Sequence, residues 1–137
     1  MGLYLCVFDG EEELDGVEVG PYAEFASFRE SITKLLEAGI AGSRFPVLIL
    51  HHDSDGEWAP GEAETLEREL TDIREAFRQL PPIELSSDWQ RQVAKNAGLG
   101  FLSLYDCFFD VDGEPLIDRL IGLAKLSQIR KLPIIFQ

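Results

Sequence analysis

The chain is organised around Tyr105-Asp106-Cys107-Phe108-Phe109-Asp110-Val111-Asp112-Gly113-Glu114-Pro115. The apolar run Tyr105–Phe109 predicts a strand, and the two aspartates after it predict a turn. Gly113 can adopt a positive φ that reverses the chain, and Pro115 suits the first position of a helix. We therefore expect a strand, an acidic turn and a helix here, followed by a last strand at Pro133–Gln137.

The same plan is expected twice earlier in the chain. The apolar run Phe45–Leu50 predicts a strand, and it leads into Asp53–Glu57, which has the same Asp-x-Asp-Gly-Glu spacing. Leu3–Phe8 carries no charge and predicts a central strand that is buried on both faces. The segment from Glu11 to Gly20 is expected to be an acidic loop.

Apolar residues at three- and four-residue spacing predict four helices. They follow Pro21, Pro60, Ser87 and Glu114, and their expected core stripes include Phe25, Phe28, Ile32 and Leu35; Ala63, Leu66, Leu70, Ile73, Phe77 and Leu80; Trp89, Val93 and Ala97; and Leu116, Ile117, Leu120, Ile121, Leu123, Ala124 and Leu126. Strands that alternate with helices predict an α+β or α/β fold. We expect a single three- to four-stranded sheet with about four helices packed against it.

Composition restricts the class of protein. The chain has 137 residues, which predicts one globular domain over residues 1–137. No apolar run approaches the roughly 20 residues that span a bilayer, and the N-terminus lacks the pattern of a signal peptide, so we expect a cytoplasmic protein that does not enter membranes. Cys6 and Cys107 are the only cysteines, and both lie in apolar runs, so we expect buried, reduced thiols.

Charge is the strongest compositional feature. The net charge is −13, and no lysine or arginine occurs before Arg29, so the acidic excess lies in the first half. Such a surface repels phosphate backbones and anionic membranes, which disfavours nucleic acid as a partner. A basic protein would be attracted to it.

The turn at Asp110 admits a catalytic interpretation. Phe108–Gly113 resembles the first motif of haloacid-dehalogenase-like phosphotransferases, in which an apolar strand ends in a nucleophilic aspartate and a second aspartate two residues later is the general acid. However, Glu114 stands where threonine or valine is usual, and too little chain follows to supply the remaining motifs of that family.

A metal site is the other chemical interpretation. The candidate ligands are His51, His52, Asp53, Asp55 and Glu57 or, in the later turn, Asp110, Asp112 and Glu114. A calcium loop counted from Asp53 places Glu64 twelfth, as required, but its glycine is fourth instead of sixth. Adjacent histidines in a strand point to opposite faces, which does not suit zinc. We therefore expect no cofactor and interpret both acidic segments as turns; a metal-dependent hydrolase or phosphotransferase that uses them is the alternative.

Several short motifs spread over nearly the whole chain lead to a family. They are Leu14–Gly20, Ser43–Pro46, the pattern His51-x-Asp53-x-Asp55-Gly56-Glu57-Trp58, Leu80–Pro82, Leu104–Leu116 and Pro133–Gln137. Taken together, they are similar to immunity proteins of bacterial polymorphic toxin systems, and in particular to the immunity protein 70 family. The resemblance implies a protein that neutralises a cognate toxin domain by tight binding, without catalysis.

The expected contact surface combines the acidic segments of the first half with one aromatic side chain. A basic toxin would be steered towards the carboxylates, and a tryptophan beside them would act as an anchor. The residues that we expect to bind the partner are Glu11, Glu12, Glu13, Asp15, Asp53, Asp55, Glu57 and Trp58.

Overall fold

The N-terminal residues form a β-hairpin. β1 (Gly2–Asp9) and β2 (Glu12–Pro21) are antiparallel, and the positive φ of Gly10, +64°, permits the tight turn between them. The predicted strand at Leu3–Phe8 is confirmed, and it is central because β1 lies between β2 and β4. Burial on both faces was wrong: Tyr4 and Phe8 remain partly exposed.

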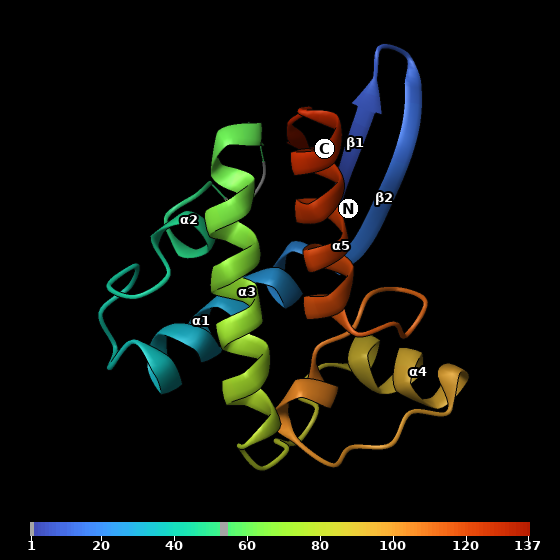
Figure 1. Cartoon of the computed structure of the whole chain (residues 1–137). Coiled ribbons are helices and arrows are strands. Elements are labelled where there is room, and N and C mark those ends of the chain that lie inside the picture. Colours follow the sequence, from blue (N-terminus) through green and yellow to red (C-terminus); the bar gives the residue numbers. More distant parts are fainter. Residues whose placement is uncertain (1, 53–54) are drawn as a thin grey trace.

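The computed structural model describes residues 2–52 and 55–137 (Figure 1). After the hairpin come α1 (Tyr22–Leu36), α2 (Pro46–Ile49), β3 (Glu57–Trp58), the 3-10 helix η1 (Pro60–Glu62), α3 (Ala63–Arg78), α4 (Asp88–Ala97), the 3-10 helix η2 (Leu104–Cys107), α5 (Leu116–Arg130) and β4 (Ile134–Phe136). The described strands form one antiparallel sheet with the order β2-β1-β4-β3. The fold is therefore α+β, as the sequence predicts.

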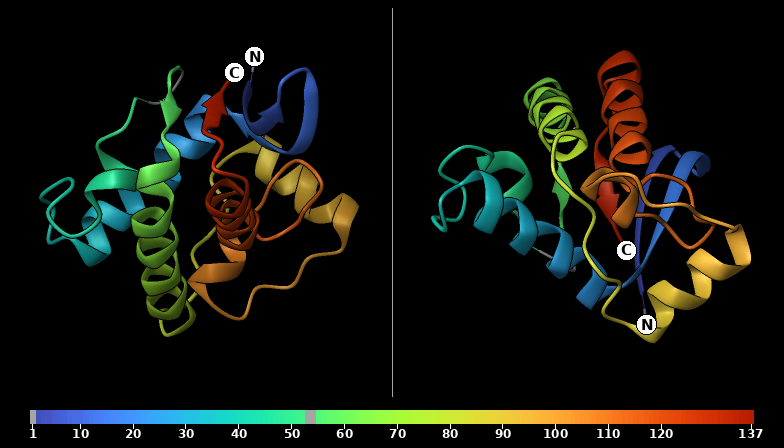
Figure 2. Two further views of the ribbon diagram at one scale, coloured as in Figure 1. Left: turned by 45° about the horizontal axis from the view of Figure 1, so that its top comes forward. Right: turned by 90° about the horizontal axis from the view of Figure 1, so that it is seen from below.

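Helices α3 and α5 lie side by side, and α5 covers one face of the β1–β2 hairpin (Figures 1 and 2). The core between the helices is aromatic. The ring centroid of Phe108 lies 5.2 Å from that of Phe28 of α1 and 5.7 Å from that of Phe77 of α3, and both ring pairs are tilted. The predicted helical stripes are confirmed for most positions, because the buried residues include Phe25, Phe28, Ile32, Leu66, Leu70, Ile73, Phe77, Leu116, Ile117, Leu120 and Leu123. Leu35 departs from its stripe, since it is 47% exposed. The stripe predicted for α4 is wrong at Ala97, which is exposed, and the buried residues of α4 are Gln90 and Ala94.

The segment expected to be an acidic loop is a strand. β2 covers Glu12–Pro21, in which Val17 and Val19 are buried while Glu18 between them is exposed. This alternation is the period of a strand with one face towards the core. Four acidic residues and two glycines around it conceal the pattern in the sequence.

The strand predicted at Phe45–Leu50 is wrong, because Pro46–Ile49 form the short helix α2. Pro46 occupies the start of the helix, where its missing N–H costs nothing. The carboxylate of Glu69 on α3 accepts hydrogen bonds from the backbone N–H groups of Val47 (3.2 Å) and Leu48 (3.0 Å). A side chain from α3, which is distant in sequence, thus accepts from the N–H groups that would have paired with a neighbouring strand.

The strand predicted at Tyr105–Phe109 is also wrong. Residues 104–107 form η2, and Phe109 makes only an isolated bridge to Pro115. The carboxylate of Asp106 accepts from the backbone N–H groups of Leu102 (2.9 Å) and Ser103 (3.1 Å), which favours a helical turn. The expected threefold repeat of strand, acidic turn and helix is therefore absent from the described residues.

The cysteine prediction is confirmed, since Cys6 and Cys107 are both free and buried. Burial raises the pKa of each thiol, which keeps both protonated at neutral pH. Among the described residues, the helices are too short or too polar to cross a lipid bilayer.

Candidate functional site

The register of the sheet places Glu57 on the face that points away from α5. Cys6 pairs with Gly16 of β2 and with Ile135 of β4, and Ile135 pairs in turn with Glu57 of β3. Directly opposed residues of antiparallel strands point to the same face. This row therefore lies on the opposite face from Val7, whose side chain is in the core.

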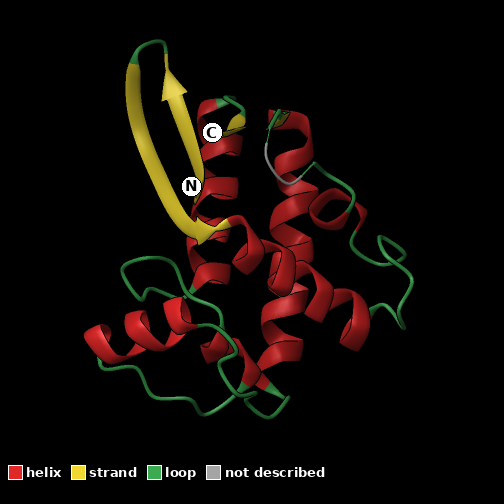
Figure 3. Cartoon of the chain, turned by 180° about the vertical axis from the view of Figure 1, so that it is seen from behind, coloured by secondary structure: helices red, strands yellow, loops and turns green. Residues whose placement is uncertain are grey.

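Two further glutamates share this outer face of the sheet. Glu18 pairs with Tyr4 and Glu13 pairs with Phe8, so both lie on the same side as Cys6. Glu13, Glu18 and Glu57 are exposed. Seen from behind, the hairpin has no helix in front of it (Figure 3), so this face is open.

The other predicted contact residues lie in different parts of the structure. Glu11 and Glu12 lie at the hairpin tip, and both are exposed. Asp55 is exposed in the loop before β3, whereas Asp53 lies outside the described residues. Asp15 lies at the edge of the sheet, where its Oδ1 accepts from the N–H of Gly16 (2.8 Å) and is 3.6 Å from Arg119 of α5.

The side chain of Trp58 does not lie on the molecular surface. Its side chain is 1% exposed, its indole N–H donates to the carbonyl of Val47 (3.0 Å), and its ring lies 4.7 Å from that of Phe136. As the neighbour of Glu57 in a strand, it points to the opposite face, which is the core. The expectation that Trp58 anchors a partner is therefore corrected: it is a core residue.

Tyr4, like Phe8, is an aromatic side chain on the face that carries Glu13, Glu18 and Glu57. Its hydroxyl donates to the carboxylate of Glu13, and its ring lies over Gly16, where a Cβ would collide with the phenol oxygen. The hydrogen bond to Glu13 and, next to it, burial raise the pKa of Tyr4 to about 12. Tyr4 therefore stays protonated and is held in one orientation across the sheet.

The turn after Phe109 has a structural role. Asp110 is 2% exposed, and its Oδ1 accepts from the backbone N–H groups of Asp112 (2.9 Å) and Glu114 (3.0 Å). Its Oδ2 is 3.5 Å from the guanidinium of Arg119, which also donates to the carbonyl of Gly16 at 2.7 Å. The carboxylate thus ties the turn to α5 and, through Arg119, to β2.

We predict that Asp110→Ala lowers the free energy of unfolding by about 2–3 kcal/mol, because two backbone N–H groups lose their acceptor and Arg119 loses a partner. Urea titration measures this change. Asp112→Ala is the control, since Asp112 is exposed in the same turn and its replacement is expected to cost about 0.5 kcal/mol or less. Equal losses in the two variants would contradict the structural role of Asp110.

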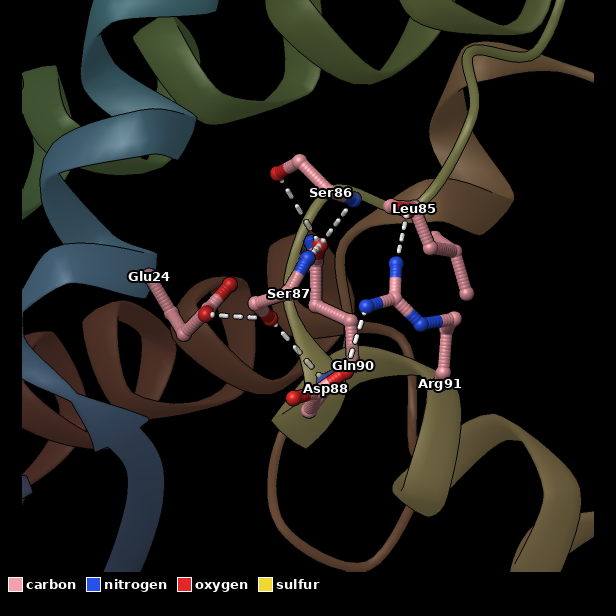
Figure 4. A network of polar contacts seen from close by, with 7 residues as sticks. All are labelled: Glu24, Leu85, Ser86, Ser87, Asp88, Gln90 and Arg91. Atoms are coloured by element: carbon pink, nitrogen blue, oxygen red, sulfur yellow. Dashed lines mark hydrogen bonds and ion pairs between the residues drawn. The ribbon is translucent and has the colours of Figure 1, made fainter.

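A second polar network anchors α4 (Figure 4). The Oγ of Ser87 accepts from the N–H of Gln90 (3.1 Å) and donates to Glu24 of α1 (2.8 Å), while Gln90 accepts in return from the N–H groups of Ser86 and Ser87. This confirms the helix start predicted at Ser87. The serine hydroxyl is used to hold α4 against α1.

The match to a family comes from the whole chain. The sequence model of immunity protein 70 matches residues 3–136, from the first residues of β1 to the end of β4. The chain belongs to the immunity protein 70 family. Comparisons with curated proteins and with solved structures found no match.

This immunity protein places His51 in structural contacts. The Nδ1 and Nε2 atoms of His51 lie 2.7 and 2.9 Å from the carbonyl oxygens of His52 and Glu57, and its ring stacks 4.2 Å from that of Phe136. Both nitrogens of His51 thus face carbonyl oxygens. Within residues 2–52 and 55–137, no group of three or more histidine, cysteine, aspartate or glutamate side chains is placed to hold a metal ion.

Sequence reasoning missed two residues of the acidic face. Glu18 was assigned to a loop and Tyr4 to a buried strand, although the pattern Val17-Glu18-Val19 is the signal of a strand with one exposed side chain. In this member of the immunity protein 70 family, the register of β2 on β1 sets Glu18 directly opposite Tyr4.

Proposed function

We propose that the chain protects its cell by binding a cognate toxin domain in the cytoplasm, without catalysis. Membership of the immunity protein 70 family supports the class of function. The observation that carries the mode of action is the gathering of Glu13, Glu18 and Glu57 on the open face of the sheet, next to the exposed Glu11 and Glu12 at the hairpin tip.

The chemistry of this face favours a basic protein partner. Clustered carboxylates steer an oppositely charged surface during diffusion and accelerate association. The same charges repel a nucleic-acid backbone and an anionic membrane. The net charge of −13 of the whole chain further favours a basic protein over a nucleic acid or an anionic membrane.

The first test of the proposed function asks whether the chain protects cells from the toxin. The toxin domain encoded next to the gene is produced in a host with and without the chain, and the two proteins are then purified together. We expect growth only when the chain is present and a stable complex of the two. Continued toxicity with a folded chain would contradict the proposal.

The acidic surface is tested separately by reversing its charge. We expect Glu11→Lys/Glu12→Lys/Glu57→Lys to slow association with the toxin domain by roughly tenfold or more at low salt, because steering is lost. Stopped-flow association at about 10 mM salt measures the rate, since screening is weakest there.

Glu64→Lys/Asp72→Lys/Glu75→Lys is the matched control for charge. It changes the net charge by the same amount on the exposed side of α3. Its association rate is expected to fall much less than that of the Glu11→Lys/Glu12→Lys/Glu57→Lys variant. If both triple variants slow association equally, net charge and not this face directs the encounter.

A further inference from the structure

A cavity of about 390 Å³ opens at the N-terminal end of the hairpin. Its walls are formed by Gly2, Tyr4, Glu18, Pro21 and Val111, among others. Tyr4 and Glu18 are the directly paired residues of the acidic outer face. The cavity therefore belongs to the surface that we propose as the contact face.

The walls of this cavity are fixed before any partner arrives. The N–H of Val111 donates to the carbonyl of Glu18 at 3.0 Å, which holds the loop after Asp110 against β2. Gly20 has a φ of +108° at the irregularity between the strands, and a Cβ on Gly2 would lie 2.9 Å from its carbonyl oxygen. Tyr4 is oriented by Glu13.

The chemistry of the walls selects a planar cation. Tyr4 supplies an aromatic ring and Glu18 a carboxylate, whereas none of the described residues that line the cavity is basic. A guanidinium group stacks on an aromatic ring, donates several hydrogen bonds in its own plane and is more weakly hydrated than an ammonium group. Both features favour arginine over lysine.

We propose that this cavity receives an arginine side chain of the toxin domain, with its guanidinium group against Tyr4 and paired with Glu18. This inference rests on the proposed function, and it specifies the side chain that the acidic face recognises. A fixed aromatic wall loses little conformational entropy on binding, which suits it to be the centre of an interface. Tyr4 thus takes the anchoring role that the sequence suggested for Trp58.

The affinity for guanidinium is tested without any toxin. Nα-acetyl-arginine amide is titrated into isotope-labelled protein and followed by nitrogen–proton correlation spectra. Saturable shifts are expected at the amides of Gly2, Tyr4, Glu18 and Val111, which line the cavity. The uncharged analogue Nα-acetyl-citrulline amide is expected to give none. Equal shifts with both compounds, or shifts at all acidic segments alike, would overturn the proposal.

A pair of matched variants locates the site. Glu18→Gln is expected to weaken binding of the arginine derivative by about threefold or more, because the carboxylate in the cavity is lost. Glu12→Gln removes the same charge from the hairpin tip, outside the cavity lining, and is expected to leave the affinity nearly unchanged. Equal weakening by both variants would show a diffuse charge effect and overturn the site.

The ring is tested by Tyr4→Leu, with the correlation spectrum of the free protein as the check on folding. The loss of the aromatic face is expected to abolish saturable binding of the arginine derivative, while Tyr4→Phe, which keeps the ring, retains it. If Tyr4→Leu is unfolded, the comparison of Glu18→Gln with Glu12→Gln decides the question. Unchanged binding in a folded Tyr4→Leu variant would refute the stacking.

The toxin domain supplies the last comparison. We expect Glu18→Gln to dissociate from it faster than Glu12→Gln, by about threefold or more. If the unmodified chain protects cells but the two variants dissociate alike, the toxin does not use the cavity and this inference fails alone. If the unmodified chain binds no toxin, the proposed function fails, whatever the arginine titration shows.

Discussion

Trp58→Ala is expected to lower the free energy of unfolding by about 3–5 kcal/mol, a large part of the stability of an ordinary domain. Trp58 is 1% exposed, and its ring contacts those of Phe136 and His51 at centroid distances of 4.7 and 5.2 Å. Its indole N–H donates to the carbonyl of Val47, so it also joins β3 to α2. Urea titration monitored by circular dichroism measures the loss.

Trp58→Phe separates the two contributions of this residue. Phenylalanine keeps most of the buried ring but leaves the carbonyl of Val47 without its donor, so we expect a smaller loss of about 1–2 kcal/mol. A Trp58→Ala variant that is as stable as the parent protein but fails to bind the toxin would restore Trp58 as a surface anchor. A destabilised variant that still binds when folded agrees with its place in the core.

Glu37→Gln is expected to lower the free energy of unfolding by about 3 kcal/mol at neutral pH, although it replaces only one heavy atom. The carboxylate of Glu37 is 2% exposed and accepts four hydrogen bonds: from the hydroxyl of Thr33 (3.0 Å) and from the N–H groups of Gly42 (3.1 Å), Arg44 (3.0 Å) and Phe45 (3.0 Å). In the Glu37→Gln variant, the amide NH2 replaces one of the two carboxylate oxygens. It therefore faces two donors that this oxygen accepts from in the parent protein. Urea titration again measures the loss.

The effect of Glu37 depends on pH in a defined direction. Burial alone would raise the pKa of this carboxyl, but the hydrogen bonds from Phe45, Arg44, Gly42 and Thr33 outweigh it, and the pKa is lowered. Its stabilisation is therefore complete above the pKa of the unfolded chain, about 4.3, and is lost as the pH falls below that value. The difference between parent and Glu37→Gln should be constant from neutral pH to about pH 5 and shrink below it.

Glu69 is the matched control for Glu37 because it is also buried and accepts only two hydrogen bonds, from Val47 and Leu48. Its pKa is raised, chiefly by burial, so its contribution is complete at low pH and decreases as the pH rises through the folded-state value. The cost of Glu69→Gln should thus be smaller at neutral pH than at acidic pH, the reverse of Glu37→Gln. The same trend in both variants would contradict this account.

The sequence predicted the elements whose signals are local. The stripes of α1, α3 and α5 recur at the period of a helix, and the uncharged apolar run Leu3–Phe8 predicts β1. Half of Phe45–Leu50 and most of Tyr105–Phe109 are buried, but a short apolar run is compatible with either a strand or a helix. Hydrogen bonds from backbone N–H groups to a carboxylate favour the helical conformation in both runs. Glu69 of α3 is the acceptor for the first run, and Asp106 is the acceptor beside the second.

The acidic face was predictable in its charge but not in its geometry. The sequence identifies Glu13 and Glu57 as acidic and close to turns, yet 43 residues lie between them in the chain, and they belong to different strands, β2 and β3. Their shared face depends on two pairings through β4, which are set only when the sheet assembles. The sequence also did not predict that Tyr4 and Glu18 are neighbours, because their pairing depends on the register of β2 on β1.

The position of β4 has a consequence for synthesis. β4 lies between β1 and β3, so the strand that joins the two parts of the sheet is the last to leave the ribosome. At about 5–20 residues per second, β1 waits several seconds for this neighbour. A nascent chain can form the β1–β2 hairpin, but Glu57 joins its face only after residues 134–136 emerge. The face that carries Glu13, Glu18 and Glu57 is therefore complete only after β4 has been synthesised.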